Sequence, residues 1–157
     1  MELVDTFGED RSANRELFAS TVSLLNEYDT GINVDYETLK FEMKLLKSTG
    51  FVPEFLVCVK CRSELLPESH LFDSSSGGVL CAGCQHGVHG QTQMISIASM
   101  KVLRNFQRSR YGDGPGSVDF STEVSAELRR LMQMYLRFTA EKDLKTTGFM
   151  DQVSKLD

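Results

Sequence analysis

The amino-acid sequence predicts a mainly α-helical fold, a helical bundle in which a four-cysteine loop is inserted between two helical halves. Three observations support this prediction. Apolar residues recur at helical spacing on both sides of the middle of the chain. All four cysteines fall within residues 58–84, and alternation of apolar and polar residues is weak outside that stretch. We therefore expect helical segments over residues 1–56 and 91–157 and a cysteine-bearing module over residues 57–90, all in one compact unit.

The composition is that of a single folded domain. The chain has 157 residues, of which 41% are hydrophobic and 25% charged, and its formal net charge is −5. This length and apolar content allow a buried core, and the acidic balance excludes a protein that wraps nucleic acid with its whole surface. No apolar run approaches the roughly 18 residues that span a bilayer, and the N-terminus lacks a secretory signal. We expect a cytoplasmic protein with no membrane partner.

Two helices are expected before the cysteines. The first is expected to end at Gly31, and its buried positions recur every three or four residues. They are Leu17, Thr21, Leu24, Leu25 and Tyr28, with Phe18 and Val22 widening the buried face. The second is expected over residues 35–49, with Asn33 or Asp35 as its N-cap and Gly50 at its end. Its buried stripe consists of Tyr36, Leu39, Met43 and Leu46.

The cysteines form two pairs, Cys58-Val-Lys-Cys61 and Cys81-Ala-Gly-Cys84, separated by nineteen residues. A two-residue gap lets the chain turn back so that both sulfurs reach one ion, and two such knuckles complete a tetrahedral Zn²⁺ site. Because four thiolates leave no position for water or substrate, the predicted zinc is structural and not catalytic. Residues 57–90 are therefore predicted to be a zinc-binding module, and removal of the metal is expected to melt at least that segment.

Two other uses of the cysteines are compatible with the sequence. Two disulfides would suit a secreted chain, and a thioredoxin-like redox pair would need a single Cys-x-x-Cys in a βαβ context. A histidine could also replace a thiolate, but four cysteines suffice, so we expect the histidines near the knuckles to be partly exposed loop residues. These are His70, His86 and His89. Three glycines are expected to serve tight turns around the metal, namely Gly77, Gly78 and Gly83.

Two helices are also expected after the cysteines. Ser96 is a candidate N-cap, with Ile95 and Met100 placed to pack against each other across it. This helix continues through Val102, Leu103 and Phe106. Residues 112–117, Gly-Asp-Gly-Pro-Gly-Ser, predict a loop. A long helix is expected from about Ser121, and its buried residues recur at heptad-like intervals: Val124, Leu128, Leu131, Tyr135 and Phe138.

The sequence indicates binding and not catalysis. It contains no phosphate-binding glycine-rich motif, no His-Glu-x-x-His and no Gly-x-Ser-x-Gly. Two basic stripes are candidate binding sites, Lys40/Lys44/Lys47 and Lys101/Arg104/Arg108. The first runs beside the apolar residues Leu39 and Met43 and would suit an acidic peptide with an apolar anchor. Each stripe alone could also be an ordinary solvated helix face.

The order of these motifs resembles the bacterial DNA repair family RecO. The likeness runs through residues 39–46, residues 50–53 and the first cysteine pair. It continues through residues 71–84, in which a Gly-Gly precedes the second pair, and through residues 135–138 and 144–150. Arg62 stands where many members of the family have glycine after the second cysteine. The resemblance spans nearly the whole chain.

The resemblance implies a non-enzymatic role in DNA recombination and repair. Members of the family anneal single-stranded DNA, act with RecR, bind the acidic C-terminal tail of the single-stranded DNA-binding protein and help load RecA. Because no short alternating strands of an OB-fold precede Cys58, the resemblance implies the C-terminal zinc-binding helical domain, or a relative without the barrel. Single-stranded DNA is then a weaker candidate partner than the acidic tail, for which the Lys40/Lys44/Lys47 stripe is the candidate site. A zinc-ribbon scaffold or regulatory protein unrelated to recombination is the alternative.

Overall fold

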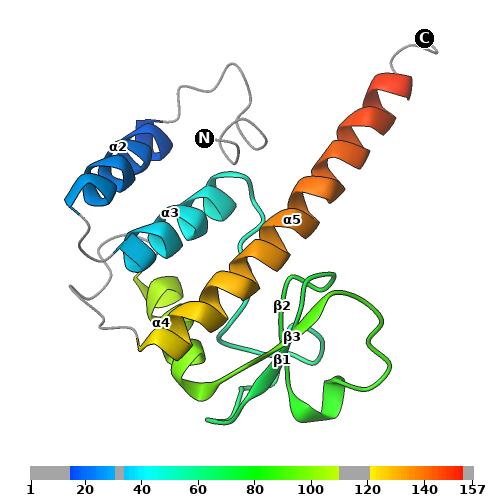
Figure 1. The fold of residues 1–157 in the computed structure, drawn as a ribbon. Coiled ribbons are helices and arrows are strands. Elements are labelled where there is room, and N and C mark those ends of the chain that lie inside the picture. The colour runs from blue at the N-terminus through cyan, green and yellow to red at the C-terminus, as the bar shows by residue number, and fades with distance from the viewer. Residues whose placement is uncertain (1–14, 31–33, 110–120, 154–157) are drawn as a thin grey trace.

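The computed structural model describes residues 15–30, 34–109 and 121–153, and there it combines helices with a small antiparallel sheet (Figure 1). The helices are α2 (Arg15–Thr30), α3 (Val34–Ser48), α4 (Ile97–Arg108) and α5 (Thr122–Val153). Between α3 and α4 lie strands β1 (His70–Asp73), β2 (Gly78–Leu80) and β3 (Thr92–Ile95), and the short 3-10 helix η1 (Ala82–Cys84). The predicted helical fold is thus confirmed in part, because the inserted segment also contains a sheet that the prediction of a loop did not include.

Helix α3 confirms the second predicted helix to within one residue at each end. Its four predicted stripe residues are all buried, and Gly50 follows its end as expected. There the N–H of Phe51 donates to the carbonyl of Leu46 at 2.8 Å, a bond that closes helices followed by glycine. The prediction of Asp35 as N-cap is wrong, since Asp35 lies inside the helix and its carboxylate accepts hydrogen bonds from α5. The other candidate cap, Asn33, and Gly31 lie outside the described residues.

Helix α2 is present where the sequence predicted it, but one predicted buried face is exposed. The exposed fractions of Phe18, Val22 and Leu25 are 73%, 40% and 54%, so the prediction that they are buried is wrong. The helix packs mainly against α3, and Leu24 on the facing side lies against the core. A single neighbouring helix covers only one side of a wide apolar stripe, which leaves the other side in solvent.

Helices α4 and α5 confirm the C-terminal predictions. The hydroxyl of Ser96 accepts a hydrogen bond from the Ser99 N–H at 3.2 Å as the N-cap of α4, and Ile95 and Met100 on either side are both buried. The expected core positions of α5 are buried at Leu128, Leu131 and Tyr135, and half-buried at Val124 and Phe138. The loop predicted over residues 112–117 lies outside the described residues.

The sheet has the strand order β2-β1-β3 and lies beside α5 in Figure 1. Phe72 in the central strand is fully buried and pairs in register with Val79 of β2. Its ring meets that of Tyr135 edge to face at 5.2 Å and stacks with that of Phe55 at 5.9 Å. These contacts join the sheet to α5 in one core. None of the described helices combines the length and hydropathy needed to cross a membrane.

Candidate metal centre

The first cysteine pair lies on a tight turn. The N–H of Cys58 donates to the carbonyl of Ser63 at 2.9 Å, and the N–H of Arg62 donates to the carbonyl of Cys58 at 2.9 Å. Val57 and Glu64 form an antiparallel bridge at the base of this turn. Arg62 adopts a φ of 63°, in the left-handed region that glycine favours. The turn therefore directs Cys58 and Cys61 toward the same point.

The second pair directly follows β2 and precedes β3. Cys81 comes after the last residue of β2, and η1 turns the chain so that the N–H of Cys84 donates to the carbonyl of Cys81 at 2.9 Å. The two pairs meet because residues 54–59 run along the outer edge of β2. There the N–H of Val59 donates to the carbonyl of Val79, and the N–H of Val79 donates to the carbonyl of Glu54, both at 3.0 Å.

Two of the three glycines near the knuckles have a specific role in this arrangement. Gly77 has a φ of 70° and turns the chain from β1 into β2. A Cβ at Gly78 would lie 2.6 Å from the carbonyl oxygen of Glu54, so only glycine lets residues 54–59 approach β2. Neither Gly78 nor Gly83 has a positive φ, so the sequence-based explanation by tight turns is wrong for both residues, and Gly83 also has no close neighbour.

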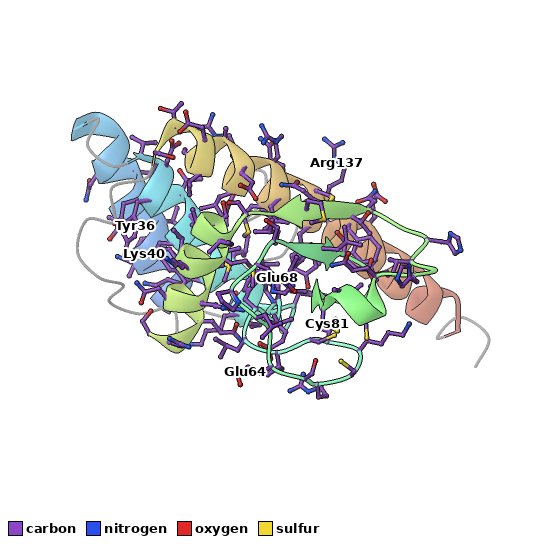
Figure 2. The ribbon with its side chains drawn as sticks, turned by 90° about the horizontal axis from the view of Figure 1, so that it is seen from below. Tyr36, Lys40, Glu64, Glu68, Cys81 and Arg137 are labelled. Atoms are coloured by element: carbon purple, nitrogen blue, oxygen red, sulfur yellow. The ribbon has the colours of Figure 1, made fainter. Side chains whose placement is uncertain are left out.

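The four cysteine sulfurs converge. All four lie within 4.8 Å of one another, and Cys61 Sγ is 3.6 Å from Cys81 Sγ. Tetrahedral zinc with Zn–S distances of about 2.3 Å would set neighbouring sulfurs about 3.8 Å apart. Figure 2 shows yellow sulfur atoms beside the labelled Cys81, at the margin of the molecule. The spacing-based prediction that the cysteines come together is confirmed, and their donor set and separation fit one tetrahedral metal ion. The four cysteines are free thiols, without a disulfide.

The close packing of the four thiols shifts their pKa values in opposite directions. The hydroxyl of Ser63 lowers the pKa of Cys61 to about 6, whereas contact with the thiols of Cys61 and Cys81 raises the pKa of Cys84 to about 12. Several thiolates at this distance repel one another, so the last proton stays bound near neutral pH. A divalent cation among the sulfurs would remove that repulsion, because metal ligation deprotonates thiols.

Two side chains of α4 hold the chain that leads to the first pair: Gln107, which the sequence analysis did not identify, and Arg104, which it identified only as part of a basic stripe. The side chain of Gln107 accepts from the Phe55 N–H at 2.9 Å and donates to the Glu54 carboxylate at 2.9 Å. Arg104 donates from Nε to the Phe55 carbonyl at 3.0 Å and from Nη2 to the Leu65 carbonyl at 3.5 Å. Arg104 therefore supports the chain around the first pair, and the second basic stripe is not a continuous solvated face.

The lysines of the Lys40/Lys44/Lys47 stripe reach solvent, whereas their apolar neighbours do not. Leu39 is 4% exposed and Met43 is fully buried, because both face the core between the helices. They are not available as a surface anchor, and that part of the predicted docking strip is wrong. Lys40 pairs with Glu37 at 3.6 Å, Lys44 is partly exposed and Lys47 is exposed.

The histidines do not join the metal centre. Among the described residues, the cluster that could hold a metal ion consists of the four cysteines. His86 and His89 are exposed, as expected, but His70 is 1% exposed at the start of β1, so the expectation of a loop residue is wrong there. Its Nε2 donates to the carbonyl of Leu66 at 2.8 Å, whereas its buried Nδ1 has no hydrogen-bond partner among the described residues. Its neighbours Leu71 and Phe72 in β1 are apolar, but so short an apolar run does not by itself identify a strand.

The family model and the most similar proteins that the comparison found all belong to the same family. A family model described as "Recombination protein O C terminal" matches residues 1–148. The chain is similar to proteins named DNA repair protein RecO: 31% identical over 156 residues to that of Dehalococcoides mccartyi (strain 195), and 30% over 155 residues to that of Roseiflexus sp. (strain RS-1). These alignments cover 98% and 99% of this chain, but only 60% and 54% of the two relatives. The chain thus spans less than two thirds of the length of these relatives. No solved structure matches it.

Proposed function

Since the chain belongs to the recombination protein O C-terminal family, we propose that it acts in DNA recombination and repair as the zinc-holding helical part of a RecO-type protein. The observation that carries the proposal is the convergence of four cysteine sulfurs within a chain that the family model matches over residues 1–148. We propose a role without catalysis, in which the metal orders the knuckles and the helices offer surface for partner proteins.

The proposed metal is structural Zn²⁺ bound by Cys58, Cys61, Cys81 and Cys84. Four thiolates are the donor set of closed zinc sites, which leave no coordination position for water or substrate. The test is metal analysis of gently purified protein, together with the thiolate-to-metal absorption of the cobalt-substituted form. We expect one zinc per chain, and loss of both signals in Cys84→Ser but not in His86→Ala. Protein without metal would overturn this assignment.

The proposed partners are the acidic C-terminal tail of the single-stranded DNA-binding protein and RecR, with single-stranded DNA as the weaker candidate. Lys44 supports a contact with the acidic tail, because it is partly exposed and has no ion-pair partner among the described residues. Lys40 and Lys47 lie one turn to either side of it on α3. With Leu39 and Met43 in the core, the proposed contact is electrostatic, and high salt should weaken it.

Parallel titrations with fluorescent tail peptide and short single-stranded oligonucleotides test this proposal. We expect the peptide to bind, and Lys44→Glu to weaken that binding and reduce its salt dependence. Lys101→Glu changes an exposed lysine on α4 in the same way, and as the matched control it should leave peptide affinity unchanged. Unchanged affinity in Lys44→Glu would exclude this surface, and binding of oligonucleotide in preference to the peptide would reverse the order of the proposed partners.

A further inference from the structure

We propose that Cys61 is the site at which hydroperoxides oxidise this protein, and that the reaction joins Cys61 to Cys81 and expels the metal. The inference rests on the zinc site proposed above and adds a reactive position to it. The four cysteines differ in the exposure of the whole residue: Cys58 is fully buried, Cys81 and Cys84 are partly buried, and Cys61 is exposed. An oxidant arriving from solvent therefore meets Cys61 first.

The sulfurs of Cys58, Cys61 and Cys81 have different neighbours, which suit them to different roles in the proposed reaction. Cys58 Sγ lies inside the molecule and accepts the N–H of Cys81 at 3.4 Å, which ties it to the backbone of the other knuckle. Cys61 Sγ lies 3.0 Å from the hydroxyl of Ser63, which can donate a hydrogen bond to a thiolate. Cys81 Sγ is 3.6 Å from Cys61 Sγ, so a second thiol is in place beside the exposed one. An exposed thiol next to a resolving thiol is the arrangement found in redox-reactive cysteines.

The reaction balances with a hydroperoxide as the oxidant. The Cys61 thiolate attacks the peroxide, so that an S–O bond forms, the O–O bond breaks and one molecule of water or alcohol leaves after protonation. The Cys81 thiolate then attacks the Cys61 sulfenic sulfur, so that the S–S bond forms, the S–O bond breaks and the hydroxide that leaves takes a proton from solvent to give water. The two sulfurs lose two electrons in total and the peroxide gains two.

Metal release follows from the number of remaining ligands. After the disulfide forms, only Cys58 and Cys84 are left as thiolates, which is fewer than a closed zinc site needs. The disulfide itself links the two knuckles, so the segment would stay closed while the ion leaves. A dithiol reductant together with zinc should restore the original state.

The test treats the zinc-loaded chain with an equimolar amount of hydrogen peroxide. A chromogenic chelator follows released zinc, and mass spectrometry after alkylation maps the disulfides. We expect a Cys61–Cys81 disulfide to form in parallel with zinc release, and both to reverse with dithiothreitol and zinc. Ser63→Ala retains all four ligands and removes a hydrogen bond that lowers the nucleophilicity of the metal-bound Cys61 thiolate, so it should speed release several-fold, whereas Ser75→Ala in the exposed turn after β1 should not.

Two results would overturn the inference. One is a disulfide within a knuckle, Cys58–Cys61 or Cys81–Cys84, and the other is oxidation of the exposed Met94 while the thiols remain reduced. Failure of the zinc assignment is a separate outcome, because the chain would contain no metal before peroxide is added. The disulfide map of that metal-free protein would still show whether Cys61 pairs with Cys81.

Discussion

The inserted segment has two ends that are stabilised in different ways. Its inner end, Phe55 with β1 and β2, places Phe72, Val79 and Leu80 in the core, where the ring of Phe72 meets that of Tyr135 in α5. Its outer end, residues 58–64 and 81–90, is mostly exposed and contains the four cysteines. Burial of aromatic rings can hold the inner end, whereas the outer end buries too little apolar surface to hold its two knuckles together. Metal dependence should therefore be confined to one end of the segment.

Removal of the metal should give the largest effect and the clearest separation of the two ends. Apparent zinc-binding free energies reach about 10–16 kcal/mol in small zinc modules, so a chelator should increase amide hydrogen exchange at the outer end by orders of magnitude. Exchange in α3 and α5 should change less, because Cys58 alone of the four cysteines is a buried member of their core. Hydrogen-exchange mass spectrometry measures both regions in one sample. Equal loss of protection across residues 57–90 would favour the broader melting that the sequence alone predicts.

The inner end should respond to a core substitution. Phe72→Ala removes a ring that contacts Phe55 and Tyr135, and should lower the free energy of unfolding by about 3–5 kcal/mol. Urea denaturation in the presence of zinc measures this loss. Leu66→Ala is the control, because Leu66 is 64% exposed, and it should change stability by no more than about 0.5 kcal/mol. Similar losses in the two variants would contradict the assignment of the inner end to the core.

The sequence predicted the helices but not the sheet of the inserted segment. The helices that carry the core were predictable, because Tyr36, Leu39, Met43 and Leu46 follow the helical period and all are buried. The sheet was not, because β1 and β2 have only four and three residues and are buried along most of their length, which removes the alternation that identifies a half-buried strand. The prediction that Phe18, Val22 and Leu25 are buried was wrong for another reason, because the helical period does not say how many neighbours a helix packs against.

The sequence likewise predicted one part of the candidate site and not the rest. The spacing of the cysteines was sufficient to predict that their sulfurs converge, because two residues between paired cysteines constrain the backbone directly. Nothing in the sequence identified Arg104 and Gln107 as supports, since their partners are carbonyl and amide groups about fifty residues away in the chain. Leu39 and Met43 were expected beside the lysines at the surface, but neighbours in a helical sequence can lie on opposite faces.

Among the described residues of α3, Glu42 is a carboxyl whose burial opposes folding. Burial of Glu42 raises its pKa from 4.5 to about 7, partly offset by Arg129, in a cavity of about 30 Å³ between α3 and α5. Because the folded pKa exceeds the unfolded value, Glu42 destabilises the fold increasingly as pH rises from 4.5 to 7, and fully above it. Glu42→Gln should therefore stabilise the protein by about 1–3 kcal/mol at pH 8.

Urea titrations at two pH values test the Glu42 prediction. The gain in Glu42→Gln should nearly vanish at pH values near the unfolded pKa of 4.5, where the native carboxyl is protonated as well. Glu141→Gln in α5 is the control, since Glu141 is exposed and should give no comparable gain. The metal content of both variants should match that of the unaltered protein. A gain of equal size at both pH values would show that the effect comes from packing and not from the buried charge.

The smallest effect is expected at the outer end, where one residue adopts a backbone conformation that its side chain disfavours. Arg62 has a φ of 63°, and the left-handed conformation costs a non-glycine residue roughly 1 kcal/mol. Its ion pair with Glu54, at 3.9 Å, is exposed and contributes little. Arg62→Gly should therefore stabilise the zinc-loaded protein by about 0.5–1 kcal/mol, whereas Arg130→Gly inside α5 should destabilise it by about 1 kcal/mol. Thermal unfolding compares the two variants, and destabilisation by both would show that the first knuckle does not need a left-handed residue after Cys61.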